Sequence, residues 1–576
     1  MKYISFSLII LIGISITFSA CEKNFLEMPL SNTTTVDSVF STATKAQGAI
    51  VNAYRNVLKQ GLPAGNAWNS MIQANLSGEL SYGQPWTVSK DIVLTGMVAT
   101  GSDEDMDGYA SNFPPIRQAF NVIENIDKVT DMSAAEKAGV KAEMKALIAY
   151  RYEQMMIIYG GVPIVSRTYE PAEDLSVPRS SVKAVLDSIV SWCDEAVVSL
   201  PSVWEDKWKG RMTKAAALAI KSKALLYAAR PLFNTATPYL NAGENNDLIS
   251  LGGFDANRWN TAAAAAEAVI TEAEGPGGAY IIENMDTPLD NYGTATSTPN
   301  NAEVLLAYKF VNTNGDWSGW NSWVMNAFYN PRFHNEATAN VLTSSFARNY
   351  YTQTGTDQVF PGIDEIKPFS DYTTRMSQME PRFKASFMAY EMSAWNNPGD
   401  NNWINTNVGV GPGYGVARSV KFYYKAGGRH WFEFPIFRLA APYLSAAEAY
   451  NEMGQPTQAL NRLNKIHVRA GLPAITETDQ VKLRAIIHRE WAVEFFDENY
   501  RLHDVKHWKL PNIGNGIIGG PITAFRYNNN GNVKSTGNAN YNDKVIYQAF
   551  WSPRMYLNHF PQTEVNKGIV VQNPGY

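Results

Sequence analysis

The chain has 576 residues, of which 45% are hydrophobic and 18% charged, and its formal net charge is −5. This length exceeds what one simple core needs and predicts two or more domains or one large layered unit. The acidic balance lacks the basic footprint of a nucleic-acid-binding protein and argues against nucleic acid as a partner.

The first 20 residues have the pattern of an export signal. Lys2 precedes an apolar run from Ile4 to Phe18, and small residues then lead to Cys21. Charged, apolar and small-residue zones in this order are typical of a signal peptide. A cysteine directly after two small residues resembles a bacterial lipoprotein box, which implies removal of residues 1–20 and lipidation of Cys21. An ordinary signal peptide with an incidental cysteine is the alternative.

Residues 21–43 form a polar tether in this interpretation, and several acyl chains on Cys21 would anchor the mature chain to a membrane, since one chain anchors weakly. No later segment approaches the roughly 18 uninterrupted apolar residues of a membrane-spanning helix. The second cysteine, Cys193, falls in a helical pattern and is expected to be a buried small apolar residue. Two cysteines exclude a disulfide framework and a cysteine-based zinc cluster.

Helical patterns dominate from residue 44 to 234. The segments with apolar positions at helical spacing are 44–59, 115–129, 133–159, 180–200 and 213–233. The third of these stops at Gly160-Gly161, with Pro163 beyond, a normal end signal for a helix.

Two later regions are rich in Gly, Asn, Pro and aromatic residues, and these regions predict loops, short helices and short strands. They are residues 235–430, the expected variable part, and residues 511–576, the loop-rich C-terminal part. Helical patterns return between them, over residues 431–510.

Residues 440–466, AAPYLSAAEAYNEMGQPTQALNRLNKI, carry a repeat signature. Ala447, Tyr450, Gly454, Ala459 and Leu463 have the spacing of a tetratricopeptide helix–turn–helix. Small residues stand where the two helices touch, and the glycine stands at the turn. Other helix pairs match only loosely, so any array is degenerate.

Several segments, taken in chain order, resemble the SusD/RagB family of outer-membrane nutrient-binding lipoproteins of Bacteroidetes. The matching segments are Cys21 with the following FLEMPL, and residues 157–165, 177–197, 210–227, 434–454, 463–473 and 488–509. The resemblance implies a mostly α-helical fold over residues 44–576, in which four degenerate tetratricopeptide-like helix pairs pack against a loop-rich, variable half with short strands. It also implies an oligosaccharide or polysaccharide ligand, a TonB-dependent SusC-like transporter as partner, and a lipid-anchored place on the outer membrane, exposed at the cell surface.

The stretch DWSGWNSW places Trp317, Trp320 and Trp323 three residues apart, separated by small or polar residues. A pyranose packs its C–H faces on aromatic rings, and its hydroxyls need polar partners. The alternative is that these rings belong to the core. We predict that Trp320 faces a sugar and that at least one of the other two tryptophans anchors the loop. The full set of glycan-binding candidates is Trp68, Tyr82, Trp86, Trp317, Trp320, Asn321, Trp323, Tyr329, Trp395 and Trp403.

Three motifs suggest other chemistry and are interpreted as structural. His503 and His507 have the spacing of a metal-binding pair, but no third ligand follows. Asp103, Asp105 and Asp107 resemble the start of a calcium loop that lacks its final Glu. Residues 409–415, GVGPGYG, lack the flanks of a phosphate loop. We therefore expect no metal, no cofactor and no catalytic residue.

Three functions remain open on the sequence. The first is a non-catalytic glycan-binding lipoprotein that delivers nutrient to a SusC-like transporter. The second is a secreted helical glycoside hydrolase, and the third is a tetratricopeptide scaffold without a small ligand. Binding without turnover separates the first from the second, and glycan affinity separates it from the third.

Overall fold

The computed structural model describes residues 35–59, 73–81, 88–96, 108–170, 172–174, 176–310, 342–389, 417–419, 421–423, 432–510, 518–528 and 540–576. These residues are mostly helical, and their strands are short, as the sequence predicts. The α-helices are α2 (Val36–Val39), α3 (Ala43–Lys59), α4 (Gln73–Leu76), α5 (Val88–Thr95), α6 (Phe113–Asn125), α7 (Ala134–Tyr159), α8 (Val182–Ser199), α9 (Lys214–Ala229), α10 (Asn257–Glu274), α11 (Pro288–Ser297), α13 (Ser344–Ala347), α14 (Phe369–Ser377), α15 (Pro381–Ser386), α17 (Ala440–Glu452), α18 (Pro456–Arg469), α19 (Gln480–Glu494), α20 (Arg501–His507) and α21 (Gln562–Val565). The strands are β1 (Val304–Phe310), β2 (Lys367–Pro368), β3 (Phe387–Ala389), β4 (Ala417–Ser419), β5 (Phe432–Arg438), β6 (Gly520–Asn528) and β7 (Asn540–Ala549). Short 3-10 turns are η2 (Tyr109–Asn112), η3 (Ile126–Lys128), η4 (Asp206–Trp208), η5 (Gly243–Leu248), η7 (Lys421–Tyr423) and η9 (Pro553–Tyr556).

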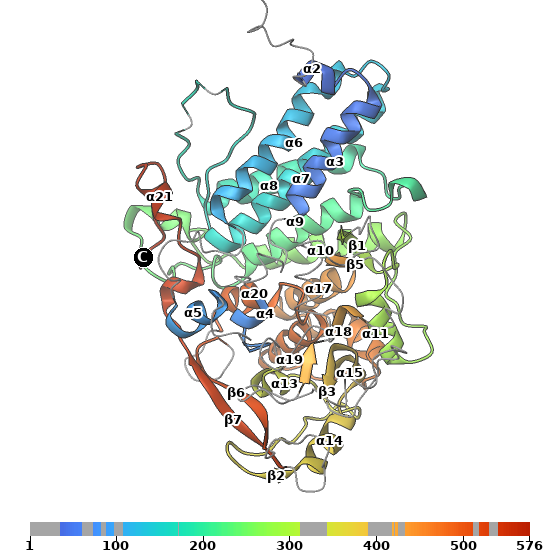
Figure 1. The fold of residues 1–576 in the computed structure, drawn as a ribbon, viewed down its shortest axis with the longest axis vertical. Helices are drawn as coiled ribbons and strands as arrows, with labels where there is room; N and C mark the ends of the chain where they lie inside the picture. Colours follow the sequence, from blue (N-terminus) through green and yellow to red (C-terminus); the bar gives the residue numbers. More distant parts are fainter. Residues whose placement is uncertain are drawn as a thin grey trace, which may run out of the picture.

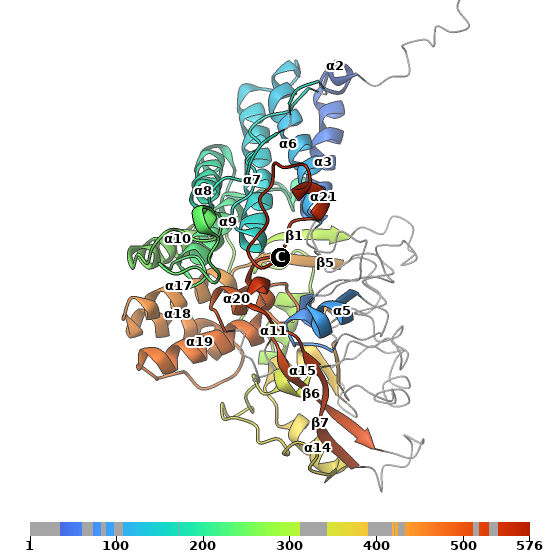
Figure 2. The same ribbon diagram turned by 90° about the vertical axis from the view of Figure 1, so that its left-hand side faces the viewer.

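Four helix pairs form a continuous stack, as the family resemblance implies. Helix α3 packs on α6, α7 on α8, α9 on α10, and α17 on α18, and each pair also contacts the next. Figure 2 shows the later helices of the stack along one side of the molecule, with β1, β5 and the β6–β7 hairpin toward the other side. Among the helices in the described part of the chain, none is both long enough and apolar enough to cross a membrane.

Helix α7 shows how the local sequence sets the ends of the stack helices. Ser133 caps its start, and Glu136 returns the bond to the backbone of Ser133 in a capping box. The helix ends at Gly160, whose φ is +80°, and a Cβ on Gly161 would lie 2.1 Å from the carbonyl oxygen of Ser180. The glycine pair is therefore required by the close approach of the chain that leads into α8.

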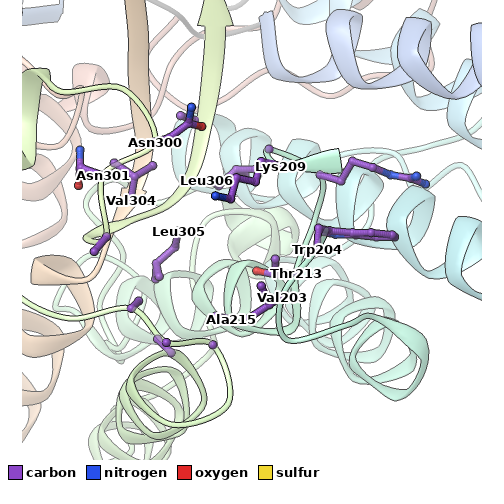
Figure 3. Close-up of a pocket in the computed structure, with 18 of the residues that line it drawn as sticks. Val203, Trp204, Lys209, Thr213, Ala215, Asn300, Asn301, Val304, Leu305 and Leu306 are labelled. Carbon is purple, nitrogen blue, oxygen red and sulfur yellow. The ribbon is translucent and has the colours of Figure 1, made fainter. Parts of the chain in front are cut away.

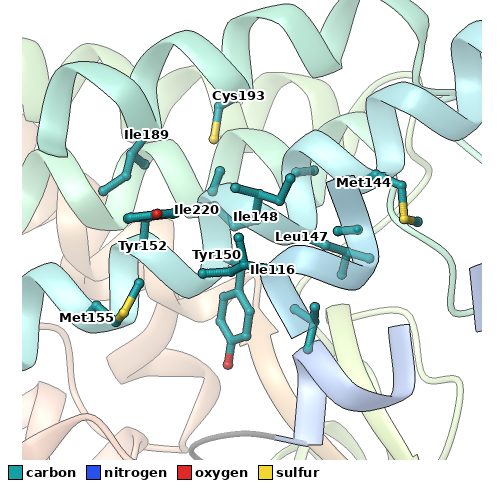
Figure 4. Close-up of a cluster of buried hydrophobic side chains, with 14 of the residues drawn as sticks. Ile116, Met144, Leu147, Ile148, Tyr150, Tyr152, Met155, Ile189, Cys193 and Ile220 are labelled. Carbon is teal, nitrogen blue, oxygen red and sulfur yellow. The ribbon is translucent and has the colours of Figure 1, made fainter. Parts of the chain in front are cut away.

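The interior of the stack is apolar and closely packed. Figure 4 shows Ile148 and Tyr152 of α7 beside Ile189 and Cys193 of α8. Cys193 is fully buried, which confirms the expectation from its helical pattern. The predicted helix–turn–helix is also confirmed, because α17 and α18 meet across Gly454, whose φ is +70°. Small residues let such helices approach closely, so the stack buries its apolar surface through neighbouring contacts.

Helix α10 differs from the expectation for its region. It lies within residues 235–430, the expected variable part, yet it packs between α9 and α17 as a member of the stack. Its sequence runs through five successive alanines, which favour helix strongly and leave room for close packing. The composition of residues 235–430 as a whole predicted loops, because Gly- and Asn-rich segments flank this helix on both sides.

The second half of the fold contains three small antiparallel sheets. Strand β1 pairs with β5, β3 with β4, and β2 with the β7 edge of the β6–β7 hairpin. The hairpin extends away from the stack toward the end of the molecule where α14 lies (Figure 1). The C-terminal residues return to the stack, where Asn573 donates a hydrogen bond to the carbonyl oxygen of Tyr159, at 3.1 Å.

Candidate functional site

The ten predicted glycan-binding residues and Cys21 lie outside the described residues, as do Asp103, Asp105, Asp107 and residues 409–415. The structure does, however, describe the residues from which the candidate-bearing segments start and at which they end. These segments are 60–72, 82–87, 311–341 and 390–416. Their ends can therefore be compared.

Most of these segment ends meet in one place, which we call the loop-root cluster: residues 73–81, 342–344, 387–389 and 417–419. Leu80 forms an antiparallel bridge with Leu342, and the N–H of Leu342 donates to the carbonyl oxygen of Ala417, at 2.9 Å. Ala417 in turn pairs with Ala389 across β3 and β4. Residues 80, 342, 389 and 417 therefore lie side by side, although the first is more than 260 residues from the others in the sequence.

Each of the four candidate-bearing segments has at least one end at this cluster. Residues 60–72 and 82–87 flank residues 73–81, residues 311–341 end at Leu342, and residues 390–416 join Ala389 to Ala417. Three segment ends lie elsewhere. Residues 60–72 follow Lys59 at the end of α3, residues 82–87 precede Val88 at the start of α5, and Phe310, before residues 311–341, pairs with Phe432 at the end of the β1–β5 sheet.

Side-chain hydrogen bonds hold the cluster together. The hydroxyl of Thr343 donates to the carbonyl oxygen of Gly78, at 2.6 Å, and also accepts from the N–H of Phe346, at 3.0 Å. The amide of Asn75 donates to the carbonyl oxygen of Ser81, at 2.5 Å. All of these groups except the Phe346 N–H belong to the cluster, and Asn75, Ser81 and Thr343 are buried. The cluster is therefore an ordered part of the interior from which the loops depart.

Glu79 ties the cluster to the connection between α19 and α20. Its carboxylate accepts from the hydroxyl of Ser77, at 2.5 Å, and from the N–H of Asp497, at 3.2 Å. Burial raises the pKa of Glu79, although the charge of Arg501 opposes this shift. Because Glu79 is 3% exposed, loss of these partners would leave a buried polar group unpaired.

An aromatic cluster supports the same place from below. Phe496, at the end of α19, lies 4.6 Å from Phe387 and 5.5 Å from Phe346, measured between ring centroids. Tyr350 packs edge-on against Phe387, at 5.7 Å. Such tilted and edge-on contacts are the arrangements that aromatic pairs prefer. The loop-root cluster therefore packs against a group of aromatic side chains formed by Phe346, Tyr350, Phe387 and Phe496.

A buried ionic network lies next to this aromatic cluster. Its cations are Arg382, Lys421, Arg438 and Arg469, and its anions are Glu303, Glu380, Glu490, Glu494 and Glu498. Arg438 is central, at 2.7 Å from Glu303, 3.0 Å from Glu494 and 2.7 Å from Glu498. Each cation in this buried set faces carboxylates, which is the condition for stable burial of charge.

The carboxylates of the network differ in pKa, since burial raises the pKa of Glu380 despite the opposing charge of Arg382. Burial raises the pKa of Glu490 and Glu494, but the neighbouring guanidinium groups outweigh burial and hold both pKa values below the ordinary range. Lys421 links the network to the loop-root cluster, because its ammonium group contacts Glu498 and the carbonyl oxygen of Phe496, both at 2.5 Å, two residues after β4.

Sequence reasoning missed this network, although part of it was visible. Glu490, Glu494 and Glu498 are spaced four apart in HREWAVEFFDENY, which places carboxylates along one side of a helix. Their partners come from residues as far away as Glu303, which the sequence could not connect to them. His503 and His507, which share this region, are buried, and His507 Nε2 lies 3.0 Å from the carbonyl oxygen of Ile157. Within the described ranges, no group of three or more His, Cys, Asp or Glu side chains could hold a metal ion.

A hollow of about 200 Å³ lies beside β1, with Val304 and Leu305 on one side and Trp204 on the other (Figure 3). Polar side chains that line the hollow are already paired within the protein. Lys309 pairs with Glu433, at 2.6 Å, and the indole N–H of Trp204 donates to the carbonyl oxygen of Met212, at 2.9 Å. The hollow is therefore a seam between the stack and β1, with little left unpaired for a ligand to bind.

Comparison with known proteins connects this fold to one family. A model of the SusD family matches residues 291–576, and a model described as starch-binding associating with outer membrane matches residues 25–226. SusD-like protein P25 of Formosa agariphila is 23% identical over 427 residues, which are 70% of each chain.

Solved structures share the fold over nearly the whole chain. A SusD-like protein from Bacteroides fragilis has a TM-score of 0.73 at 21% identity, over 94% of this chain and 98% of its own. A SusD-like carbohydrate binding protein from Bacteroides fragilis has a TM-score of 0.69 at 18% identity, over 92% and 99%. A laminarin binding SusD-like protein has a TM-score of 0.58 at 18% identity, over 93% and 100%. The chain therefore belongs to the SusD/RagB family, which includes carbohydrate-binding proteins.

Proposed function

We propose that this protein is a cell-surface lipoprotein that binds an oligosaccharide or polysaccharide without cleaving it and delivers it to a TonB-dependent SusC-like transporter. The observation that carries the proposal is the loop-root cluster, at which four aromatic-bearing segments are joined in a member of a carbohydrate-binding family. A glycan needs several rings and amides presented together, and segments with a common root can supply them.

The chemistry of these segments suits a sugar. Trp320 and its neighbours supply flat apolar faces for C–H patches, and Asn321 supplies an amide for hydroxyl groups. In this proposal Trp320 is the first sugar-facing ring.

Anchoring and delivery follow from the N-terminus and from the family. Lipidated Cys21 would hold the chain on the outer membrane, and the tether over residues 21–43 would let it reach a transporter in the same membrane. Affinity purification of the tagged, lipidated chain from its native membrane tests this part. Recovery of a TonB-dependent barrel supports delivery, and repeated recovery of the lipoprotein alone contradicts it.

Calorimetric titration with a panel of oligosaccharides tests glycan binding, and the panel begins with laminarin fragments, the ligand class named for one related structure. For the glycan that binds, we expect Trp320→Ala to weaken affinity about tenfold or more, because a central stacked aromatic carries much of the binding energy.

Trp208→Ala is the matched control, since Trp208 lies in η4, between two helices of the stack, and its loss should leave affinity unchanged. Release of reducing sugar at enzyme-like rates would overturn the non-catalytic proposal and favour a glycoside hydrolase. Failure of the whole panel to bind would favour a scaffold without a small ligand.

A further inference from the structure

A second cavity, of about 650 Å³, is lined by no residue of the loop-root cluster. It is bounded by the start of α6, the connection from α7 to α8, and the C-terminal segment around α21. None of these elements belongs to the loop-root cluster or to the ionic network. The volume falls in the range of small-molecule binding sites.

The wall of this cavity is largely apolar. Phe113, Val165, Val177, Ile569 and Val570 contribute to it from all three boundaries. Phe113, Val165, Val177 and Ile569 are half-buried, so their apolar surface is available to a ligand. An apolar body would therefore gain stabilisation by covering these side chains.

One polar group that lines the cavity, the hydroxyl of Tyr109, makes no hydrogen bond within the described part of the chain. Tyr109 is 3% exposed, and its ring packs edge-on against Phe113, Tyr159 and Phe560. Burial raises the pKa of Tyr109, so the hydroxyl stays protonated and can donate. The hydroxyl oxygen keeps accessible surface on the cavity side, so an acceptor of a bound ligand can reach it.

The rim of the cavity carries charges of both signs, since Arg117, Arg167 and Lys567 line it together with Glu170 and Glu564. Lys567 is paired with Glu564, at 2.7 Å, and Arg167 is paired with Glu173, at 2.5 Å, while it covers the ring of Tyr169 at 4.3 Å. Arg117 is exposed and forms no ion pair with any residue that the structure describes. A guanidinium group of this kind binds a carboxylate with two parallel hydrogen bonds.

We propose that this cavity is a second binding site, which takes a small carboxylate with an apolar body. The body covers the apolar wall, a polar acceptor of the ligand receives the hydroxyl of Tyr109, and the carboxylate faces Arg117 at the rim. The site is independent of the proposed glycan site, because it shares no residue with the loop-root cluster or with the segments that depart from it. Its test therefore succeeds or fails separately.

Calorimetric titration of the full mature chain with two probes tests the proposal. The probes are decanoate, with an aliphatic body, and 4-hydroxycinnamate, with an aromatic body and a hydroxyl opposite its carboxylate; their neutral amides serve as ligand controls. We expect at least one acid to bind and its amide to bind about tenfold more weakly, since a charge-assisted pair with Arg117 is lost. The acid that binds more tightly shows whether the site prefers an aliphatic or an aromatic ligand.

Three variants locate the binding. Arg117→Gln should weaken either acid about tenfold. Tyr109→Phe, which keeps the ring contacts, should weaken 4-hydroxycinnamate severalfold and decanoate little, because only 4-hydroxycinnamate has an acceptor apart from its carboxylate. Ala110→Trp, which fills the cavity from an exposed position that lines it, should abolish binding. Lys183→Gln, an exposed charge change on α8, is the control and should have no effect.

Circular dichroism spectra and melting temperatures verify that each variant is folded. The proposal is overturned if neither acid binds at millimolar concentration. It is equally overturned if folded Arg117→Gln and Ala110→Trp bind the acid as well as the unchanged protein does.

Discussion

The helical stack and the region around the loop-root cluster are held together in different ways. In the stack, each helix contacts its neighbours along an apolar surface; some ion pairs, such as Arg230 with Glu448, are buried, and others, such as Arg462 with Glu267, lie at its partly exposed edge. Around the loop roots, full charges are buried, and Arg438 joins carboxylates from two distant parts of the chain, Glu303 on one side and Glu494 with Glu498 on the other. The stack is stabilised mainly by apolar contacts between neighbouring helices, with smaller sets of buried ion pairs, whereas beside the loop roots four cations and five carboxylates form one connected buried network.

The difference has a functional consequence. Apolar helix packing tolerates many substitutions of similar volume, but a buried ion network fixes the relative positions of its members. A surface that must present several rings to one glycan needs its supports fixed. We infer that the network holds the loop roots in place, and that the stack can vary with less effect on binding.

Replacement of Arg438 is expected to lower the free energy of unfolding more than any other substitution considered for the two regions. Arg438→Met leaves Glu303, Glu494 and Glu498 with less compensating charge in the interior, which should lower the free energy of unfolding by about 3–5 kcal/mol. Urea denaturation measures the change. Arg462→Met is the matched control in the stack, and its partly exposed pair should cost at most about 1 kcal/mol. Equal losses in the two variants would refute the distinction.

Acid should weaken the protein partly through His507. Burial lowers the pKa of His507 from 6.5 to about 3. Below pH 6.5 the unfolded chain therefore binds a proton that the folded chain excludes, and stability falls as pH decreases toward 3. This residue alone contributes a slope of up to about 1.4 kcal/mol per pH unit, or roughly 2 kcal/mol between pH 6.5 and 5.

The variant His507→Gln measures how much of the pH dependence of stability comes from His507. Urea denaturation at pH 7 and pH 5 should show the unchanged protein losing about 2 kcal/mol more than the variant does. The same pH dependence in both proteins would mean that His507 does not titrate as its burial requires.

The smallest expected stability changes come from two threonine substitutions, one in the loop-root cluster and one in the stack, which should differ in their effect on glycan binding. Thr343→Val removes a hydroxyl that bonds Gly78 and caps α13, and Thr213→Val removes the hydroxyl that caps α9 in the stack. Each should lower the free energy of unfolding by about 1 kcal/mol. Glycan affinity measured by calorimetry should fall only for Thr343→Val. An equal fall in affinity for both variants would show that the loop roots have no special part in binding.

The sequence predicted well those parts of the fold that rest on local signals. The start of α7 follows from Ser133 and Glu136 and its end from Gly160, while the α17–α18 turn follows from Gly454. Helix α10 was missed because composition averaged over a wide region concealed a run of alanines.

The loop-root cluster and the ionic network could not be predicted, for a physical reason. Leu80 meets Leu342, and Arg438 meets Glu303, through contacts that depend on the whole fold and leave no periodic pattern in the sequence. The spacing of Glu490, Glu494 and Glu498 was a usable signal for one side of the network. The sugar-facing residues, Trp320 first among them, remain predictions, since they lie outside the described residues.

Hydrogen exchange measured by mass spectrometry, with and without a saturating glycan, tests the central claim most directly. The account predicts protection in residues 60–72, 82–87, 311–341 and 390–416, the segments joined at the loop-root cluster, with little change in α7, α8 and α21. Protection confined to the helical stack, with these four segments unchanged, would contradict it.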